Sequence, residues 1–511
     1  MNTTSHRVAL IAAALIVLAG CYSNNAGYLD LDGGVGGLGP IGPAPDGGVG
    51  GASGTDGGSG GSGAIDGGGA GGNGGAGAAG GGGSTGGTGG LPLTGSWQRP
   101  VVIDSHDGVG LNPQVSIGAK GEAVAVWVQS NLGAYKVWAN RYVAPGGWEG
   151  DLLIGTTDGN AADLTKTSQP DVVVDANGAA TAAWADYSDP VVRGLVSRRH
   201  TTPDGWGARS TIYHGVSTAG DARVAVDGLG NVMAVFSTGT GAWANYFQPA
   251  LGWDGAQIID NVPNAPIGVQ VALEPDGNGW AAWSQGPPGS QNIFGNHFSP
   301  VSAWGGAARV EEGTLGNALD PQLAVDASGN ALFVWKLTSS LRFQVWSNRW
   351  DASEGRFTDP VRLDSAGTAY APVLASDPQG NGTAAWIQSA QVSGTPLQVA
   401  ASRYTPGSGW SAPETLAEGD IQSDPRVAMD SQGNAVIAYV QKAPAETSPD
   451  AWAHTYSEGA WSPAVRLSLD PDDPDVCIVC PAFQPSVAMD PSGHAVAVWR
   501  EGPDIWASTF E

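Results

Sequence analysis

The sequence predicts an all-β fold in which eight antiparallel sheets, each of four strands, close into a ring. Three observations predict it. A motif of two short β-rich runs joined by a tight turn occurs eight times, about 47 to 60 residues apart. A third and a fourth β-rich run follow the motif within each unit. The β-rich part of the chain also opens with a lone fourth run and ends after a third run, so the two ends together supply one complete unit.

The repeated motif supplies the first two strands of each unit. At its turn, an aspartate such as Asp326 accepts hydrogen bonds from the turn backbone, and a glycine such as Gly329 adopts positive φ. The aspartate is absent at Gly118 and is replaced by Glu274, so we interpret the motif as a hairpin and not as a repeated metal site. It reads PQLAVDASGNALFVW at 321–335 and recurs from 170, 425 and 485, with looser copies from Pro113, Ala222, Val269 and Pro372.

The third strand is predicted in segments such as VWANRY (137–142) and VWSNRW (345–350). A Gly-Trp pair then opens the fourth strand, as in GWEGDLLIG (147–155). Four short strands in a unit of about fifty residues are typical of a propeller blade. From about residue 95 to 511, the sequence therefore resembles β-propeller repeats in general, and it matches no specific functional subfamily.

The last unit lacks a fourth strand, because the chain ends after the third run IWASTF (505–510). The opening stretch GSWQRPVVID (95–104) corresponds to the fourth run GAWSPAVRLS (459–468) of another unit. Pairing this N-terminal strand with the C-terminal three strands leaves no open sheet edge. We therefore expect an all-β, eight-bladed β-propeller of four-stranded antiparallel blades over residues 94–511.

Twenty tryptophans suggest a sugar-binding surface until they are sorted by position. Eighteen recur at the end of the second strand, within the third, or at the start of the fourth. Packing between blades best explains such a repeat, because one indole buries about 150–250 Å². Trp280 and Trp350 fall outside these positions, and Trp280 is a candidate for a binding face. The three sets are Trp127, Trp184, Trp283, Trp335, Trp386 and Trp499; Trp138, Trp243, Trp346, Trp452 and Trp506; and Trp97, Trp148, Trp206, Trp253, Trp304, Trp410 and Trp461.

Residues 1–20 have the features of a secretion signal. His6 and Arg7 precede an apolar run from 8 to 18 that is too short to span a bilayer. The run ends in LAGC (18–21), which resembles the lipobox of bacterial lipoproteins. The resemblance implies cleavage before Cys21 and lipid attachment to it. Tyr22 follows, and not the aspartate typical of inner-membrane retention, so an anchor in the outer membrane is expected, on its periplasmic or cell-surface side.

Residues 21–93 are expected to form a disordered tether behind the lipidated cysteine. The segment is dominated by glycine with Ala, Ser, Thr and scattered Asp, a composition that cannot bury enough apolar surface to offset its ordering entropy. The formal net charge of the chain is −26. Nucleic acid and anionic lipid need a cationic surface, so both are excluded as partners.

Variable loops mark one face of the predicted ring. The loops between second and third strands and those between units differ in length and sequence, whereas the other two connections are regular. Variable loops on a rigid scaffold commonly carry binding residues. The candidates for this binding face are His106, Asp107, Asp186, Tyr187, Asp189 and Trp280.

The longest loop between units, LDPDDPDVCIVCPAFQ (469–484), holds two further features. Cys477 and Cys480 could form a redox pair, half a zinc site or a small disulfide. We favour the disulfide, because the protein carries an export signal and two more zinc ligands are absent nearby. Four carboxylates of the loop are weak calcium candidates that lack a specific ligand spacing. These are Asp470, Asp472, Asp473 and Asp475.

No residue pattern identifies a reaction. The repeated turn departs from the sialidase pattern S-x-D-x-G-x-x-W, and the histidines show no paired metal-ligand spacing. The leading hypothesis is therefore a monomeric, lipid-anchored module without a cofactor or catalytic residues, which binds a protein or a glycan. One alternative is a glycan hydrolase, sialidase-like or otherwise, using carboxylates such as Asp107, Asp186 or Asp189. A scaffold subunit of an envelope complex is the other.

Overall fold

The computed structural model describes residues 92–131, 134–157, 169–186, 194–215, 219–220, 222–312, 316–339, 342–365, 367–390, 396–444, 446–470, 473 and 480–511. All of these residues belong to one compact unit, Gly87–Glu511. The predictions for the signal segment, Cys21 and most of the tether lie outside the described residues. The described residues form strands and turns with no helix, which confirms the all-β class.

Strands β2–β6 illustrate the unit from which the second part of the chain is built. The first three strands, β2 (Val109–Ile117), β3 (Ala123–Asn131) and β4 (Ala134–Val143), pair antiparallel in chain order. Two short strands, β5 (Gly147–Trp148) and β6 (Leu152–Thr156), share the fourth position and both pair with β4. The four-stranded antiparallel unit is thus as predicted, except that its fourth strand is broken after the Gly-Trp pair.

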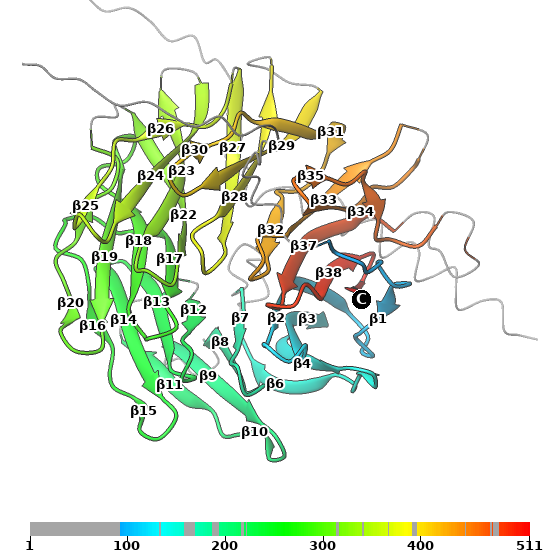
Figure 1. The fold of residues 1–511 in the computed structure, drawn as a ribbon. Coiled ribbons are helices and arrows are strands. Elements are labelled where there is room, and N and C mark those ends of the chain that lie inside the picture. The colour runs from blue at the N-terminus through cyan, green and yellow to red at the C-terminus, as the bar shows by residue number, and fades with distance from the viewer. Residues whose placement is uncertain are drawn as a thin grey trace, which may run out of the picture. The chain divides into compact units, whose positions relative to one another are not determined.

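Six more units repeat this order. In Figure 1 short strands such as β10, β15, β20 and β25 lie at the periphery, while first strands such as β7, β12, β17 and β22 lie toward the middle. Three units comprise β7 (Asp171–Val174), β8 (Ala180–Asp186), β9 (Gly194–Thr201), β10 (Gly205–Trp206) and β11 (Ser210–His214); β12 (Arg223–Val226), β13 (Val232–Thr238), β14 (Gly241–Gln248), β15 (Gly252–Trp253) and β16 (Gln257–Ile258); and β17 (Ile267–Leu273), β18 (Gly279–Gln285), β19 (Asn292–Ser299), β20 (Ala303–Trp304) and β21 (Ala308–Arg309).

Two of the next three units are joined to each other by strand pairing. β31 pairs with both β29 and β33, which joins two units into a ten-stranded sheet. The strands are β22 (Asn317–Val325), β23 (Ala331–Ser339), β24 (Arg342–Asp351), β25 (Arg356–Phe357) and β26 (Val361–Arg362); β27 (Thr368–Ser376), β28 (Gly382–Ser389), β29 (Leu397–Thr405), β30 (Gly409–Trp410) and β31 (Glu414–Ile421); and β32 (Arg426–Met429), β33 (Ala435–Lys442), β34 (Asp450–Ser457), β35 (Ala460–Trp461) and β36 (Val465–Arg466).

The remaining sheet contains both ends of the β-rich region. Its strands lie in the order β1 (Val101–Val102), β39 (Asp504–Phe510), β38 (Ala495–Glu501) and β37 (Ala482–Met489). Val102 pairs with Trp506, and Trp97 forms an isolated bridge with Phe510. The opening stretch of the folded sequence therefore occupies the fourth position beside the C-terminal three strands.

Apolar clusters join each unit to the next. One joins Val126 of β3 to Trp184 of β8, and another joins Trp127 of β3 to Ile505 of β39, so the first unit also packs against the last sheet. The six tryptophans that end second strands are fully buried in these clusters. Their predicted role in packing between units is confirmed.

The hairpin turns touch one another in series. Asp326 Oδ1 accepts the backbone NH groups of Ser328 and Asn330 at 2.8 and 3.0 Å, which confirms the predicted turn. A Cβ on Gly380 of the next turn would lie 2.6 Å from Asp326 Oδ2, so the turn glycine permits a close approach between units. The neighbouring pairs are Gly121 with Asp490, Gly178 with Glu122, Gly230 with Asp175, Gly277 with Asp227, Gly329 with Glu274, Gly380 with Asp326, Gly433 with Asp377 and Gly493 with Asp430.

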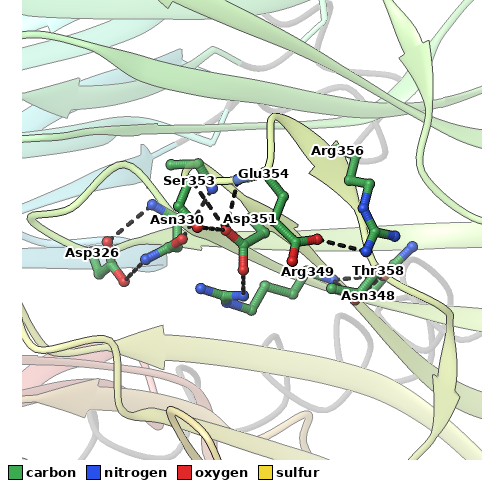
Figure 2. A network of polar contacts seen from close by, with 10 residues as sticks. Asp326, Asn330, Asn348, Arg349, Asp351, Ser353, Glu354, Arg356 and Thr358 are labelled. Carbon is green, nitrogen blue, oxygen red and sulfur yellow. Dashed lines mark hydrogen bonds and ion pairs between the residues drawn. The ribbon is translucent and has the colours of Figure 1, made fainter. Parts of the chain in front are cut away.

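The arginines of third strands stabilise the turns at the same end of the sheets. Arg349 pairs with Asp351 at 2.6 Å, and both are drawn in Figure 2. Asn330 of the hairpin accepts the NH of Ala352 at 3.1 Å. Arg199 likewise binds Asp175 at 2.6 Å. The hydrogen bonds from Ser353 and Arg349 hold the pKa of Asp351 well below its usual range. Arg349 and Arg199 are therefore paired with acidic side chains of the turns.

Close packing between units predicts that Gly155→Ala destabilises the protein. The added Cβ would lie 2.3 Å from Cζ2 of Trp184, which is fully buried and has no room to move. Overpacking of a rigid core costs about 1–3 kcal/mol. Urea unfolding followed by tryptophan fluorescence measures this loss. Gly306→Ala, where an added Cβ meets nothing within 4 Å, is the control and should leave the midpoint unchanged.

Candidate active site

The structure does not gather the predicted binding-face residues into one site. His106 and Asp107 are neighbours and both are exposed. Asp186 is buried and forms an ion pair with Arg209. Tyr187 and Asp189 lie outside the described residues. Trp280 is only 3% exposed and packs against Phe333, Trp350 and Phe357, so it offers no surface to a ligand, contrary to the expectation.

The cysteines and acidic residues of the 469–484 loop are described in part. Cys480 is disulfide-bonded, while Cys477 lies outside the described residues, so their pairing stays a prediction. Asp473 forms an ion pair with Arg99 at 3.0 Å. Within the described part of the chain, no group of three or more His, Cys, Asp and Glu residues is placed to hold a metal ion, and two of the calcium candidates, Asp472 and Asp475, fall outside it.

Asp104 is the carboxyl group whose surroundings depart most from the repeat. It follows β1 in the connection to β2, and only 9% of the residue is exposed. The backbone NH of Ile505 donates to its carboxylate, while Oδ2 is buried without a hydrogen-bond partner. An unpaired buried oxygen is costly in a structural role, because its lost hydration is not replaced. Asp104 is therefore a candidate for chemistry.

Carboxylates at the same place in three other units show what a structural role requires. Each accepts a backbone NH at the start of a third strand, as Glu311 does from Ile293 at 2.9 Å. Each also has a side-chain donor: Arg309 for Glu311 at 2.8 Å, Arg362 for Asp364, and Gln285 Nε2 for Asp260 at 2.6 Å.

Asp104 lacks these donors for two reasons. The arginine that precedes Glu311 and Asp364 by two residues is replaced by Val102. Gln129, the counterpart of Gln285, donates instead to the carbonyl oxygen of His106 at 3.1 Å. The equivalent carboxylates of other units, Asp260, Glu311 and Asp364, thus accept hydrogen bonds from side chains, whereas Asp104 is buried without such a donor.

A second carboxylate near Asp104 is well satisfied. Ser105 Oγ donates to Asp151 Oδ1 at 2.6 Å, and the NH of Ser105 donates to Oδ2 at 3.2 Å. His106 Nδ1 lies 2.8 Å from Asp151 Oδ2, and the His106 ring lies against Trp138, tilted by 37°, with a centroid distance of 3.7 Å. The short segment after β1 therefore brings Asp104, Ser105 and His106 against Asp151.

The two carboxyl groups are shifted in opposite directions. Burial raises the pKa of Asp104 to about 7, and the negative charges of Asp504 and Asp151 add to the shift. Burial also disfavours ionisation of Asp151, but hydrogen bonds from Ser105 and His106 outweigh it and hold its pKa below the ordinary value. Near neutral pH the site therefore holds one carboxyl able to donate a proton and one that stays ionised.

The chain is closely packed beside the unpaired oxygen, at Gly110. A Cβ on Gly110 of β2 would lie 3.5 Å from Asp104 Oδ2 and 2.5 Å from Cδ1 of Ile505. No side chain other than hydrogen fits there without displacing Ile505. The sequence reasoning named His106 and Asp107 but missed Asp104 and Asp151. Val102 in place of an arginine does not single out Asp104, because Ile258 stands at the same place before Asp260, which is paired.

Glu274 is a second buried carboxyl with a raised pKa, and it has a structural origin. It replaces the turn aspartate, is 5% exposed, and its Oε1 has no hydrogen-bond partner. Burial raises its pKa to about 7, and the charges of Asp276 and Asp326 contribute. Because the folded state holds this proton more tightly than the unfolded chain, stability is expected to fall as pH rises from about 4.5 to about 7.

Glu274→Gln is expected to remove this pH dependence. At about 1.4 kcal/mol per pKa unit, the shift from 4.5 to about 7 corresponds to roughly 3.5 kcal/mol, so the variant gains up to that amount over the parent at pH 8 and little at pH 4. Chemical unfolding at both pH values measures the difference. Glu414→Gln, an exposed residue of β31, controls for the loss of one negative charge. An equal gain at both pH values would contradict this origin of the instability.

No protein-family model and no curated protein matches the chain. Among solved structures, it is similar to a polysaccharide lyase, an ulvan lyase bound to an oligosaccharide, with 11% identity and a TM-score of 0.44 over 80% of this chain and 95% of that one. It is similar to a leech intramolecular trans-sialidase at 9% identity and a TM-score of 0.37, over 81% and 93%. It is also similar to an α-L-arabinofuranosidase from Fusarium graminearum, with 12% identity and a TM-score of 0.36 over 57% of this chain and 93% of that one.

The names of these three proteins are those of glycan-processing enzymes. The matches contradict the expectation that the chain is not an enzyme, and that expectation is withdrawn. At 9–12% identity they say nothing of a substrate. The activity of this chain is inferred from its own residues.

Proposed function

We propose that the protein is a glycan-active hydrolase in which Asp104 donates a proton to the leaving oxygen of a glycosidic bond. The observation that carries this proposal is the buried, unpaired Oδ2 of Asp104 in a position where equivalent carboxylates are paired. Asp151 supplies the second carboxylate, kept ionised by Ser105 and His106. Its negative charge can support the positive charge that develops on the sugar ring, directly or through an activated water.

The reaction class follows from the two carboxyl groups. Glycosidases use one protonated and one ionised carboxyl on either side of the scissile bond. Environments that push the pKa values of two neighbouring groups apart assign the acid and the base. Burial and nearby negative charge do this for Asp104, and three donated hydrogen bonds do the reverse for Asp151. The loop that carries Asp104 also carries His106 and Asp107, the exposed residues expected on the binding face.

The scaffold we propose is a closed, eight-bladed β-propeller. Support comes from the eight turn contacts, which lead from each unit to the next and from Gly121 of the first unit back to Asp490 of the last sheet. The apolar cluster that joins Trp127 to Ile505 links the same two sheets. Closure matters for function, because Asp104 lies in the connection between the last sheet and the first unit.

We also propose that the enzyme is exported and lipid-anchored through Cys21 to the outer membrane. The support is the LAGC sequence after the apolar run of the leader. Among the described residues, no helix reaches the length and hydrophobicity that a membrane span requires. Cys21→Ser is the test of the anchor: the variant should appear in the aqueous phase of a detergent partition, where the parent should not.

The catalytic proposal is tested by measuring glycan depolymerisation. The purified protein is incubated with neutral, sulfated, uronic-acid and sialylated glycans, and new reducing ends are counted. Release from at least one class is expected, with optimum activity below about pH 7 because Asp104 must be protonated. A folded protein that releases no reducing ends from any of these classes would argue against the proposal.

A further inference from the structure

A cavity of about 370 Å³ lies between the unit β7–β11 and the unit β12–β16. Its volume is in the range of small-ligand sites. Aromatic rings dominate the lining, and hydroxyl, imidazole and backbone groups lie between them. The residues used below are Tyr213, His214, Trp243, Asn245, Trp253 and Ala256.

The interface between the last sheet and the first unit is the counterpart of this place. The two places correspond residue by residue. Asn245 Nδ2 donates to the carbonyl of Ile212 at 2.7 Å, as Asn140 does to Ile103 at 2.8 Å. The NH of Gly255 donates to Asn245 Oδ1 at 3.0 Å, as that of Gly150 does to Asn140 at 3.0 Å. Trp243 therefore corresponds to Trp138.

A histidine covers the indole at one of the two places. The His106 ring lies 3.7 Å from the Trp138 ring and is tied down by Asp151 at 2.8 Å. The residues at the corresponding positions are Gly215 and Ala256. Neither can supply a ring or a carboxylate, and the group nearest to a Cβ on Gly215 would be the hydroxyl of Tyr213, at 2.1 Å.

The polar atoms of the two indoles in the cavity are already engaged. Trp243 Nε1 donates to Thr238 Oγ1 at 3.1 Å, and Trp253 Nε1 donates to Ser197 Oγ at 2.9 Å. Trp243 and Trp253 can therefore contact a ligand through the faces of their rings. Tyr213 lies 5.5 Å from Trp243 and, with Thr211 and His214, adds polar groups at the edge of that surface.

We propose that this cleft binds one sugar ring of a glycan, packed against the rings of Trp243 and Trp253. A pyranose fits the lining, because its C–H face packs on an indole while its hydroxyl edge meets hydroxyl and imidazole groups. The inference rests on the proposed function: the cleft holds part of the glycan that is cleaved, without touching the reacting bond.

The test refills the cleft with the side chains of its counterpart. The triple variant Tyr213→Asp, Gly215→His and Ala256→Asp copies Asp104, His106 and Asp151. Tyr213 must change as well, because a Cβ on Gly215 would lie 2.1 Å from its Oη. Titration calorimetry with neutral cello-, xylo- and chito-hexaose and with oligogalacturonate should show binding to the parent and at least tenfold weaker binding to the triple variant.

Two further variants secure the result. Gln257→Ala, next to the cleft but outside its lining, should bind as the parent does. If the triple variant does not fold, Ala256→Leu replaces it in the test. This single change places a larger side chain in the cleft and should weaken binding. Unchanged binding by a folded filled variant overturns the inference, and so does the absence of binding to every hexasaccharide.

Asp104→Asn separates this inference from the proposed function. Loss of turnover with binding kept supports both. If the parent cleaves a glycan that binds equally well to the variant with the filled cleft, the inference alone is overturned. Binding that depends on the cleft, without turnover of any glycan by the parent, overturns the proposed function alone.

Discussion

Asp104→Asn is expected to lower kcat for glycan cleavage by a factor of about 10² to 10⁴, the usual contribution of a general acid. The amide has almost the same shape as the carboxyl group but has no proton to give to the leaving oxygen. The hydrogen bond from the NH of Ile505 is kept, because the side-chain oxygen still accepts it. KM should change little, since Asp104 acts on the bond that breaks.

The pH dependence distinguishes a catalytic from a structural role. In the parent, kcat should fall as pH rises through about 7, where Asp104 loses its proton. The fall on the acid side should come at a pH below the ordinary range of an aspartate, because hydrogen bonds from Ser105 and His106 lower the pKa of Asp151. Glu414→Gln, at an exposed residue of β31, is the control and should keep both rate and profile. If Asp104→Asn kept the rate and its alkaline limb, another residue would be the acid.

The repeat allowed most of the fold to be predicted from sequence. Strand order follows from the hairpin motif and the Gly-Trp pair, because a feature seen in eight copies is read with little ambiguity. The same repetition explains why second-strand tryptophans such as Trp386 are buried. Trp280 was misread because its position has an aromatic residue in only one unit, and its burial depends on a neighbour, Phe333, of the next unit.

The candidate site was harder to predict, because it is a deviation from the repeat. A carboxylate after the fourth strand recurs as Asp260, Glu311 and Asp364, so Asp104 looks like one more structural residue. What sets it apart is a missing donor, and that donor comes from a side chain two residues earlier or from the adjacent unit. Such a difference is visible only when the partner of each carboxylate is known. Asp151 likewise becomes notable only beside Ser105 and His106.

Deleting residues 92–104 is expected to abolish cooperative folding of the β-rich region. The deletion removes β1, which pairs with β39, and the bridge between Trp97 and Phe510. It also removes Ile103, which is 3% exposed in the cluster shared by the last sheet and the first unit. Each large apolar side chain contributes about 1.5–3 kcal/mol, and β39 would become an unpaired edge. The summed loss is comparable to the total stability of a typical domain, about 5–15 kcal/mol.

The strand can be returned as a separate peptide, which tests pairing itself. A synthetic peptide of residues 92–104 should restore a cooperative thermal transition to the shortened protein, by filling the vacant place beside β39. A peptide with Trp97→Ala and Ile103→Asp should not, because it cannot bury those two side chains. A variant lacking residues 22–86 is the control and should melt as the parent does, since it keeps every contact of β1. Cooperative unfolding of the shortened protein without peptide, at the temperature of the parent, would show that this segment does not hold the last sheet to the first unit.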